Sequence, residues 1–243
     1  MAANANQFRN YLLSRLEDRT LDAMGPHLGP IPLPRAMILA TPSEHSEFVY
    51  FIEAGIASAI VVSPEGRRSE TGVIGREGVT PISHVLADGK MPIEVVMQLD
   101  GEGYRLRGDV FASALQSSPD LRTLMLRYVQ AFFIQCAFTS LSNAIHHVEE
   151  RLARWLLMCH DRADGDRMAL THEFISVMLS VRRPSVTTAL HVLEGKRLIT
   201  SERNLVVIRD RAALEEFAKD AYGLSEGEYE RLICTLRKSG PHP

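Results

Sequence analysis

The stretch THEFISVMLSVRRPSVTTALHVLEGKRLI, residues 171–199, decides the fold and predicts two short helices joined by a tight turn. Thr171 is a suitable N-cap, and the apolar residues that follow it recur at helical spacing. Residues 180–181 interrupt this spacing. A second helix then begins with Pro184 in its first turn, where a missing N–H costs little, and Gly195 is expected to end it as a C′ glycine.

The second helix has an apolar face and a polar face. Its inward residues are Val186, Ala189, Leu190 and Leu193, and its outward residues are Arg183, Ser185, Thr187, Thr188 and His191. The outward side chains carry hydrogen-bond donors. A second helix with basic and hydroxyl residues at its N-terminal end is typical of a helix-turn-helix, in which that end contacts base edges. Two strands follow, at 198–201 and 205–208, and the hairpin that they form is expected to be a wing.

Positive charge is concentrated in this region. Residues 171–209 contain six Lys or Arg and three Glu, a net charge of +3, whereas the whole chain has a formal net charge of −3. Basic residues therefore gather where contact with phosphates requires them. Two alternatives remain open: an ordinary helical hairpin in which Arg182 and Arg183 form a solvated end, and a winged helix that binds another protein.

The segment LTHEFISVMLSVRRPSVTTALHVLEGKRLI, residues 170–199, resembles the DNA-binding segment of the Crp/Fnr family of bacterial transcription regulators. The preceding VEERLARWLLMCHDR, residues 148–162, is similar to the helix that leads into it. The resemblance implies an α+β fold with three parts. These are an N-terminal double-stranded β-roll of the cyclic-nucleotide-binding type (1–118), a dimerisation helix (119–146) and a winged helix-turn-helix domain with a C-terminal helical extension (147–243).

The N-terminal half agrees with this expectation. Short apolar runs between residues 35 and 107, such as FVYFI, IASAIVV and IEVVMQL, alternate with Pro, Gly and charged turns, which indicates a β-barrel, sandwich or roll. A one-turn helix at residues 112–115 is expected to follow. Near the C-terminus, Ser225 and Glu228 predict a capping box for a last helix that packs on the domain, and the tail from Ser239 is expected to be disordered.

Effectors used in the family can be compared with the residues present. Members that bind cyclic AMP hold its phosphate with an Arg, and the corresponding segment GVTPISHVLADGKMPIEV, residues 78–95, contains no Arg. We therefore expect no cofactor, and cyclic AMP in particular is not expected. An iron–sulfur cluster needs four thiolates, and the chain has only Cys136, Cys159 and Cys234. His84 as a haem ligand and a metal cluster at residues 146–150 are alternatives that we do not favour. An unidentified small-molecule effector stays open.

A helical stretch of about forty residues begins after Pro119. Apolar side chains recur along it at alternating steps of three and four, and the stripe is too wide to be hidden against one roll. Pairing with a symmetry mate would bury the remainder, and the alternative is a core helix of a monomer. The family resemblance likewise implies a homodimer. We expect the dimer interface to contain Leu121, Leu124, Tyr128, Phe132, Gln135 and Phe138.

Other classes of protein are less consistent with the sequence. No GxSxG, HExxH or glycine-rich phosphate loop is present, so an enzyme is not expected, and a cupin-like metal site would need His on the strand runs, which have none. MAANANQFRN lacks the apolar core of a signal peptide, and no run approaches a membrane span, so we expect a cytoplasmic protein that does not contact a membrane.

The sequence therefore predicts a transcription regulator that binds double-stranded DNA as a homodimer on palindromic sites and contacts RNA polymerase. A small-molecule sensor whose helix-turn-helix binds a protein partner is the alternative. The residues expected to contact bases are Arg182, Arg183, Ser185, Thr188 and His191, and those expected to contact phosphates are Thr171, His172, Lys196 and Arg203. No catalytic or metal-binding residue is expected. Where TGTGA-reading members have a Glu after the Arg, this chain has Pro184, so its preferred site should differ.

Overall fold

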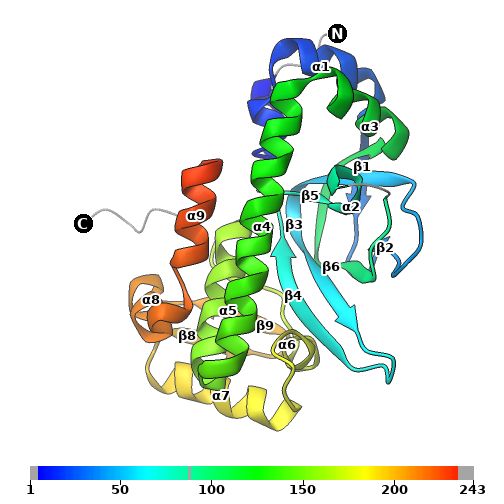
Figure 1. Cartoon of the computed structure of the whole chain (residues 1–243). Coiled ribbons are helices and arrows are strands. Elements are labelled where there is room, and N and C mark those ends of the chain that lie inside the picture. Colours follow the sequence, from blue (N-terminus) through cyan, green and yellow to red (C-terminus); the bar gives the residue numbers. More distant parts are fainter. Residues whose placement is uncertain (1–4, 87–88, 235–243) are drawn as a thin grey trace.

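The structure is a computed structural model that describes residues 5–86 and 89–234. An N-terminal β-roll is followed by a long helix and a C-terminal winged helix-turn-helix (Figure 1). The expected α+β fold is confirmed. The disorder expected after Ser239 concerns residues outside the described ranges.

Six antiparallel strands form the roll, in the order β1-β6-β3-β4, with β2 paired to β6 and β5 paired to β3. Their bounds are β1 Gly29–Leu33, β2 Ile38–Ala40, β3 Phe48–Val62, β4 Arg68–Ile74, β5 Val79–Thr80 and β6 Ile93–Arg107. Apolar runs that look separate in the sequence join into two strands of 15 residues, β3 and β6. The register between the two strands shifts around Gly55 (φ 88°), which lies close to Gly101. Only glycine fits at position 101, because a Cβ there would lie 1.9 Å from the Ala54 carbonyl oxygen.

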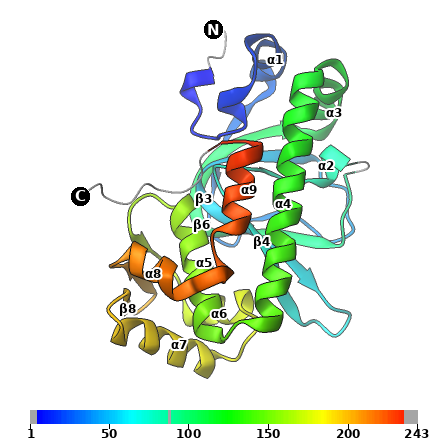
Figure 2. The ribbon, with the colours of Figure 1, turned by 60° about the vertical axis from the view of Figure 1, so that its left-hand side comes forward.

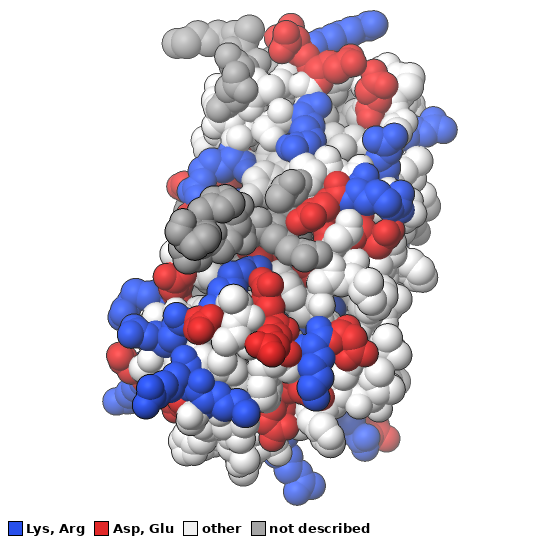
Figure 3. All heavy atoms as spheres, turned by 90° about the vertical axis from the view of Figure 1, so that its left-hand side faces the viewer, with Lys and Arg blue, Asp and Glu red and all other residues white. Residues whose placement is uncertain are grey.

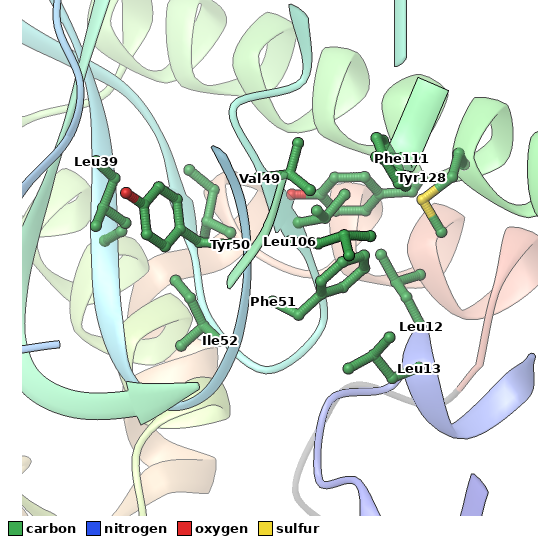
Figure 4. Packing of buried hydrophobic residues seen from close by; sticks show 14 of the residues in the cluster. Leu12, Leu13, Leu39, Val49, Tyr50, Phe51, Ile52, Leu106, Phe111 and Tyr128 are labelled. Atoms are coloured by element: carbon green, nitrogen blue, oxygen red, sulfur yellow. The ribbon is translucent and has the colours of Figure 1, made fainter. Parts of the chain in front are cut away.

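The chain before the roll closes one end of its core. It forms the short helices η1 Ala5–Gln7, η2 Leu13–Arg15, α1 Asp18–Met24 and η3 Gly25–His27. Leu12 and Leu13 are fully buried and pack with roll residues such as Phe51 and with Phe111 of α3 (Figure 4). Asn10 ties this segment to the roll, because its side chain donates to the carbonyl oxygens of Ile52 and Gly78.

Three helices follow strands of the roll. They are α2 Ser83–Leu86, α3 Gly108–Ser117 and α4 Pro119–Ile145. The helix expected at residues 112–115 is therefore longer at both ends. The Ser118 hydroxyl caps α4 by accepting from the Leu121 N–H at 3.2 Å, so α3 and α4 meet at a single residue.

The buried face of α4 is the one that was predicted to meet a partner. Of the residues expected at the dimer interface, Leu121, Tyr128, Phe132 and Gln135 are at most 8% exposed within the chain, and Leu124 and Phe138 are partly buried. The Gln135 amide oxygen accepts from the Val73 N–H of β4 at 2.7 Å. These four side chains are therefore occupied in closing the roll, whereas contact of Leu124 and Phe138 with a second copy stays a prediction.

The opposite face of α4 is open. Its exposed large apolar side chains are Leu126 (47%), Phe133 (71%), Leu141 (46%) and Ile145 (60%). By length and composition α4 could also cross a membrane, with a mean hydropathy of 1.2 in an 18-residue window. The expectation that no stretch of the sequence is long and apolar enough to span a membrane is therefore wrong. In the folded chain one side of α4 packs against the roll and the last helix.

The C-terminal part contains the expected winged helix-turn-helix and a further strand. Its elements are α5 Val148–Arg162, β7 Arg167–Met168, α6 His172–Met178, α7 Arg183–Gly195, β8 Ile199–Glu202, β9 Leu205–Ile208, α8 Arg211–Ala218, η4 Lys219–Ala221 and α9 Leu224–Leu232. β7 pairs with β9, so the wing is the edge of a three-stranded sheet. Gly195 is the last residue of α7, and Arg197 (φ 62°) takes the left-handed conformation that was expected of Gly195.

The last helix lies beside α4 (Figures 1 and 2). The Glu226 carboxylate caps its start by accepting from the Gly223 N–H at 2.9 Å, which is half of a capping box because Gly223 has no side chain, and Ser225 lies inside the helix. The box predicted from Ser225 and Glu228 is therefore wrong by two residues. Tyr229 of α9 is buried in the core of the roll, so this extension packs on the N-terminal half as well.

The winged helix-turn-helix half is packed onto the roll. Ile56, Ile60 and Val73 of the roll belong to the same apolar cluster as α5, α6 and α7. Polar contacts cross the same boundary: Arg162 Nε donates to Glu77 Oε1 at 2.7 Å with both side chains 2% exposed. Arg9 and Arg76 both donate to Asp164, and these hydrogen bonds lower the pKa of Asp164 to about 2. The two halves are therefore held in one defined orientation.

Candidate nucleic-acid interface

Helix α7 lies at one end of the molecule (Figure 1). The Thr171 hydroxyl caps α6 by accepting from the Phe174 N–H at 3.1 Å, as predicted. The turn between α6 and α7 contains Ser180 in the left-handed region (φ 51°). The four residues predicted to face inward on α7, Val186, Ala189, Leu190 and Leu193, are at most 1% exposed. Packing of this face against α5 and α6 leaves the polar face of α7 outside.

The residues predicted to contact bases share that outer face. Arg182, Arg183, Ser185, Thr188 and His191 are all exposed. The Thr188 hydroxyl donates to the Pro184 carbonyl oxygen at 3.1 Å, so its lone pairs face outward as acceptors. The structure brings these five side chains together on α7, from its N-cap residue Arg182 to His191 in the third turn. Their contact with bases stays a prediction.

The residues predicted to contact phosphates surround α7. Thr171 and His172 are partly buried at the first turn of α6, and Arg203 is exposed in the turn of the wing. Lys196 follows α7, and its Nζ lies 5.5 Å from the centroid of the Phe217 ring of α8. Lys and Arg side chains gather, with acidic ones among them, at the lower edge of the molecule (Figure 3), and the wing lies at the same end (Figure 2).

Two side-chain contacts join the first turn of α6 to α7. Glu173 Oε1 lies 2.5 Å from Arg183 Nη2, and both side chains are well exposed. The Thr187 hydroxyl lies 3.2 Å from His172 Nδ1. Sequence reasoning missed the role of Glu173, which counted only as one of three acidic residues in a basic stretch. Its position in the first turn of α6 was the available signal.

The roll contains a small cavity between β2, β3, β5, β6 and α4. Its volume is about 20 Å³, enough for a water molecule or two. Its lining is mainly apolar, with Ala59, Ile74, Val95 and Phe132 among the walls, and no Arg is among the described residues that line it. Polar groups come from Thr41, Glu44, Ser46, Thr80 and Ser83. In this conformation the cavity has no room for a nucleotide.

The other histidines considered as ligands have local partners. His84 lies in α2, and its Nε2 is 2.8 Å from the Ser46 carbonyl oxygen. Burial lowers the pKa of His84. His146 Nε2 lies 3.1 Å from Asp220 Oδ1, and Glu150 pairs with Lys219 at 2.5 Å. Within residues 5–86 and 89–234, no group of three or more His, Cys, Asp or Glu side chains is arranged to hold a metal ion.

Comparison with known proteins found a family model for the helix-turn-helix and solved structures with a similar fold. A family model described as a Crp-like helix-turn-helix domain matches residues 150–217. No curated protein matches this chain significantly. Among solved structures, a Crp/Fnr-family transcriptional regulator from Eubacterium rectale superimposes with a TM-score of 0.67 at 15% identity, over 86% of this chain and 97% of its own.

Two further structures have the same architecture. FixK2 from Bradyrhizobium japonicum has a TM-score of 0.67 at 17% identity and covers 78% of this chain and 96% of its own. A CRP-family regulator from Thermus thermophilus has a TM-score of 0.63 at 19% identity and covers 77% of this chain and 96% of its own. At these identities the likeness concerns the fold.

Proposed function

Since residues 150–217 form a Crp-like helix-turn-helix domain in a chain with the fold of Crp/Fnr transcriptional regulators, we propose that this protein is a sequence-specific DNA-binding regulator that acts as a homodimer. The observation that carries the proposal is the outer face of α7. It presents Arg182, Arg183, Ser185, Thr188 and His191 together at one end of the molecule, and no segment within residues 5–86 and 89–234 covers them. This is the arrangement in which a recognition helix enters a major groove.

Arg183 is the residue to which we assign the main base contact. A guanidinium can donate two hydrogen bonds to the O6 and N7 atoms of guanine, and such a pair contributes roughly 1–3 kcal/mol of discrimination. Pro184 follows Arg183 and has no group that can accept from cytosine, so the preferred sequence differs from sites read by an Arg-Glu pair. Lys196 and Arg203 would hold the protein on the phosphates, with Thr171 and His172.

The homodimer is proposed on the open face of α4. Leu126, Phe133 and Ser140 are exposed and spaced by seven residues, and the exposed Ala137 and Ala144 each follow four residues after Phe133 and Ser140. This spacing is that of a two-stranded helix pair with small residues at the close approach. A second copy is the partner that fits, because a two-fold axis along this stripe matches each exposed apolar residue with its own equivalent. Two α7 helices would then face DNA half-sites about 34 Å apart, as in a palindrome.

Control of this activity is a separate part of the proposal. We assign any effector to the roll. Cyclic AMP does not fit the small cavity, because no Arg that could pair with a phosphate is among the described residues that line it, and the cavity has room for a water molecule or two. An effector at this cavity would have to enlarge it. RNA polymerase, in the cytoplasm, is the further partner that a bound regulator would contact.

The experiment that tests the function is sequencing of genomic DNA fragments retained by the purified protein at two salt concentrations. Wild type is compared with Arg183→Ala and with Arg67→Ala, a matched control on the exposed β3–β4 turn. We expect a palindromic motif that is retained by wild type and by the control and is lost in Arg183→Ala. Retention without a motif in wild type would contradict sequence-specific binding. Absence of retention at both salt concentrations would favour a helix-turn-helix that binds a protein.

A further inference from the structure

Glu173 is an acidic residue beside Arg183, the residue predicted to make the main base contact. Glu173 projects from the first turn of α6 and contacts Arg183 at 2.5 Å, with 71% of the Glu173 side chain and 60% of the Arg183 side chain exposed. Thr171 and His172, the residues before it, are those expected to face phosphates. A carboxylate at this position repels the backbone of any DNA that approaches α7.

The ion pair contributes little to folding. Exposed pairs between Arg and Glu typically stabilise a protein by less than about 1 kcal/mol, because water screens the charges and two flexible side chains lose freedom. The Glu173 carboxylate weakens binding to every DNA sequence, but its contact with Arg183 can still favour one sequence over another. This depends on which hydrogen-bond donors of Arg183 stay available for a base.

Glu173 restricts Arg183 and leaves most of its donors free. The carboxylate contacts only the Nη2 nitrogen of Arg183, and an arginine side chain has five N–H donors in a rigid plane. A free arginine side chain loses about 2 kcal/mol of rotamer entropy when it is immobilised. A guanidinium already held by a neighbour has lost part of that freedom before DNA arrives, which is the usual advantage of pre-organisation.

A second contact fixes the same two helix ends. The Thr187 hydroxyl, one turn after Arg183, lies 3.2 Å from His172 Nδ1, one residue before Glu173. The first turn of α6 therefore contacts α7 at two successive positions on one side. The contact of Thr187 with His172 holds the first turn of α6, and with it Glu173, against α7.

We propose that Glu173 is a positioning residue for sequence discrimination, and this rests on the function proposed above. On the preferred site, the aligned guanidinium offsets the repulsion between Glu173 and the phosphates. On random DNA no guanine is in register, so only the repulsion remains. Glu173 thus increases the ratio of specific to non-specific affinity without contacting a base itself.

The test measures Kd for the retained motif and for a scrambled duplex at two salt concentrations. Glu173→Ala is compared with Glu202→Ala, which removes the same charge from the exposed wing beside Arg203. We expect Glu202→Ala to tighten both complexes by the same factor. Glu173→Ala should tighten only the scrambled complex, so that the ratio falls about 3–10-fold, which is part of the discrimination available from one bidentate contact. Glu173→Gln, which keeps a neutral acceptor, should give an intermediate ratio.

Two comparisons separate this inference from the proposed function. In the Arg183→Ala background, Glu173→Ala should leave the ratio unchanged, because the side chain that it positions is gone. If Glu173→Ala tightens both duplexes equally, as the wing variant does, the inference is wrong while the proposed function stands. If wild type itself does not distinguish the two duplexes, the proposed function fails. Unchanged circular dichroism and Tm would show that each variant is folded.

Discussion

The indole N–H of Trp155 in α5 donates to the Glu70 carboxylate in β4, with Nε1 and Oε1 2.8 Å apart. The Ser58 hydroxyl of β3 donates to the other oxygen of Glu70. Glu70 is 3% exposed, and burial raises the pKa of its carboxyl to about 7 from 4.5. Arg154 and Arg162 lie near enough to oppose that shift in part. A titratable group therefore lies at the boundary between the roll and the DNA-binding half.

The first prediction concerns pH. Because the pKa of Glu70 is higher in the folded state, its contribution to stability is fully present below about pH 4.5 and is lost as the pH rises through about 7. The loss is on the order of 3 kcal/mol at pH 8. Glu70→Gln keeps an acceptor for Trp155 and cannot ionise, so it should unfold at the same urea concentration as wild type near pH 5 and at a higher one at pH 8. Equal midpoints at pH 8 would contradict this. Burial also raises the pKa of Asp161, to about 6. The stability of both proteins should therefore keep a smaller pH dependence.

The second prediction concerns the oligomer. Phe133→Glu places a charge in the centre of the open stripe of α4. The variant should be a monomer in sedimentation experiments, because a two-fold interface would bury two unpaired carboxylates, one from each copy. Leu86→Glu, at a 54% exposed position of α2, is the control and should stay dimeric. A dimeric Phe133→Glu protein would place the interface elsewhere.

The third prediction concerns the buried ion pair between Glu77 and Arg162. Glu77→Gln leaves the Arg162 charge in the interior and should lower the free energy of unfolding by about 3–5 kcal/mol. Glu65→Gln breaks the exposed pair with Arg67, whose side chains are 73% and 83% exposed, and should cost under about 1 kcal/mol. Urea titration of both variants checks the difference, and similar losses would contradict the assigned burial.

The fourth prediction separates phosphate contacts from base contacts. Arg203→Ala in the wing should weaken binding to specific and random duplexes by the same factor and reduce the slope of log K against log salt by about 1. Arg183→Ala should instead affect the specific duplex more. A selective loss on the specific site in Arg203→Ala would mean that the wing reads bases.

Local chemistry explains why much of the helix-turn-helix could be predicted. Thr171 as a cap, Pro184 in a first turn and the inward spacing of Val186, Ala189, Leu190 and Leu193 depend on neighbours within a few residues. The error at Gly195 is of the same local kind: the left-handed residue is Arg197, which comes two residues later. A glycine permits that conformation but does not require it.

The face of α4 could not be predicted in the same way. Its sequence is apolar on more than one side, and periodicity alone does not say which side meets the roll. Tyr128 and Phe133 are five residues apart, yet one is 2% exposed and the other 71% exposed. The roll and α9 occupy the side of Tyr128, and these elements come from chain segments far away in sequence.

The sequence by itself therefore determined the secondary structure of the helix-turn-helix segment and the residues that line the outer face of α7, because both depend on short-range spacing and capping. The order of the three parts was implied by the family resemblance. Only the tertiary structure decided which face of α4 is free, where α9 packs, that Glu70 and Trp155 meet, and that Glu173 holds Arg183. Those relationships join side chains from different elements, and their distances depend on how the elements pack rather than on any local pattern.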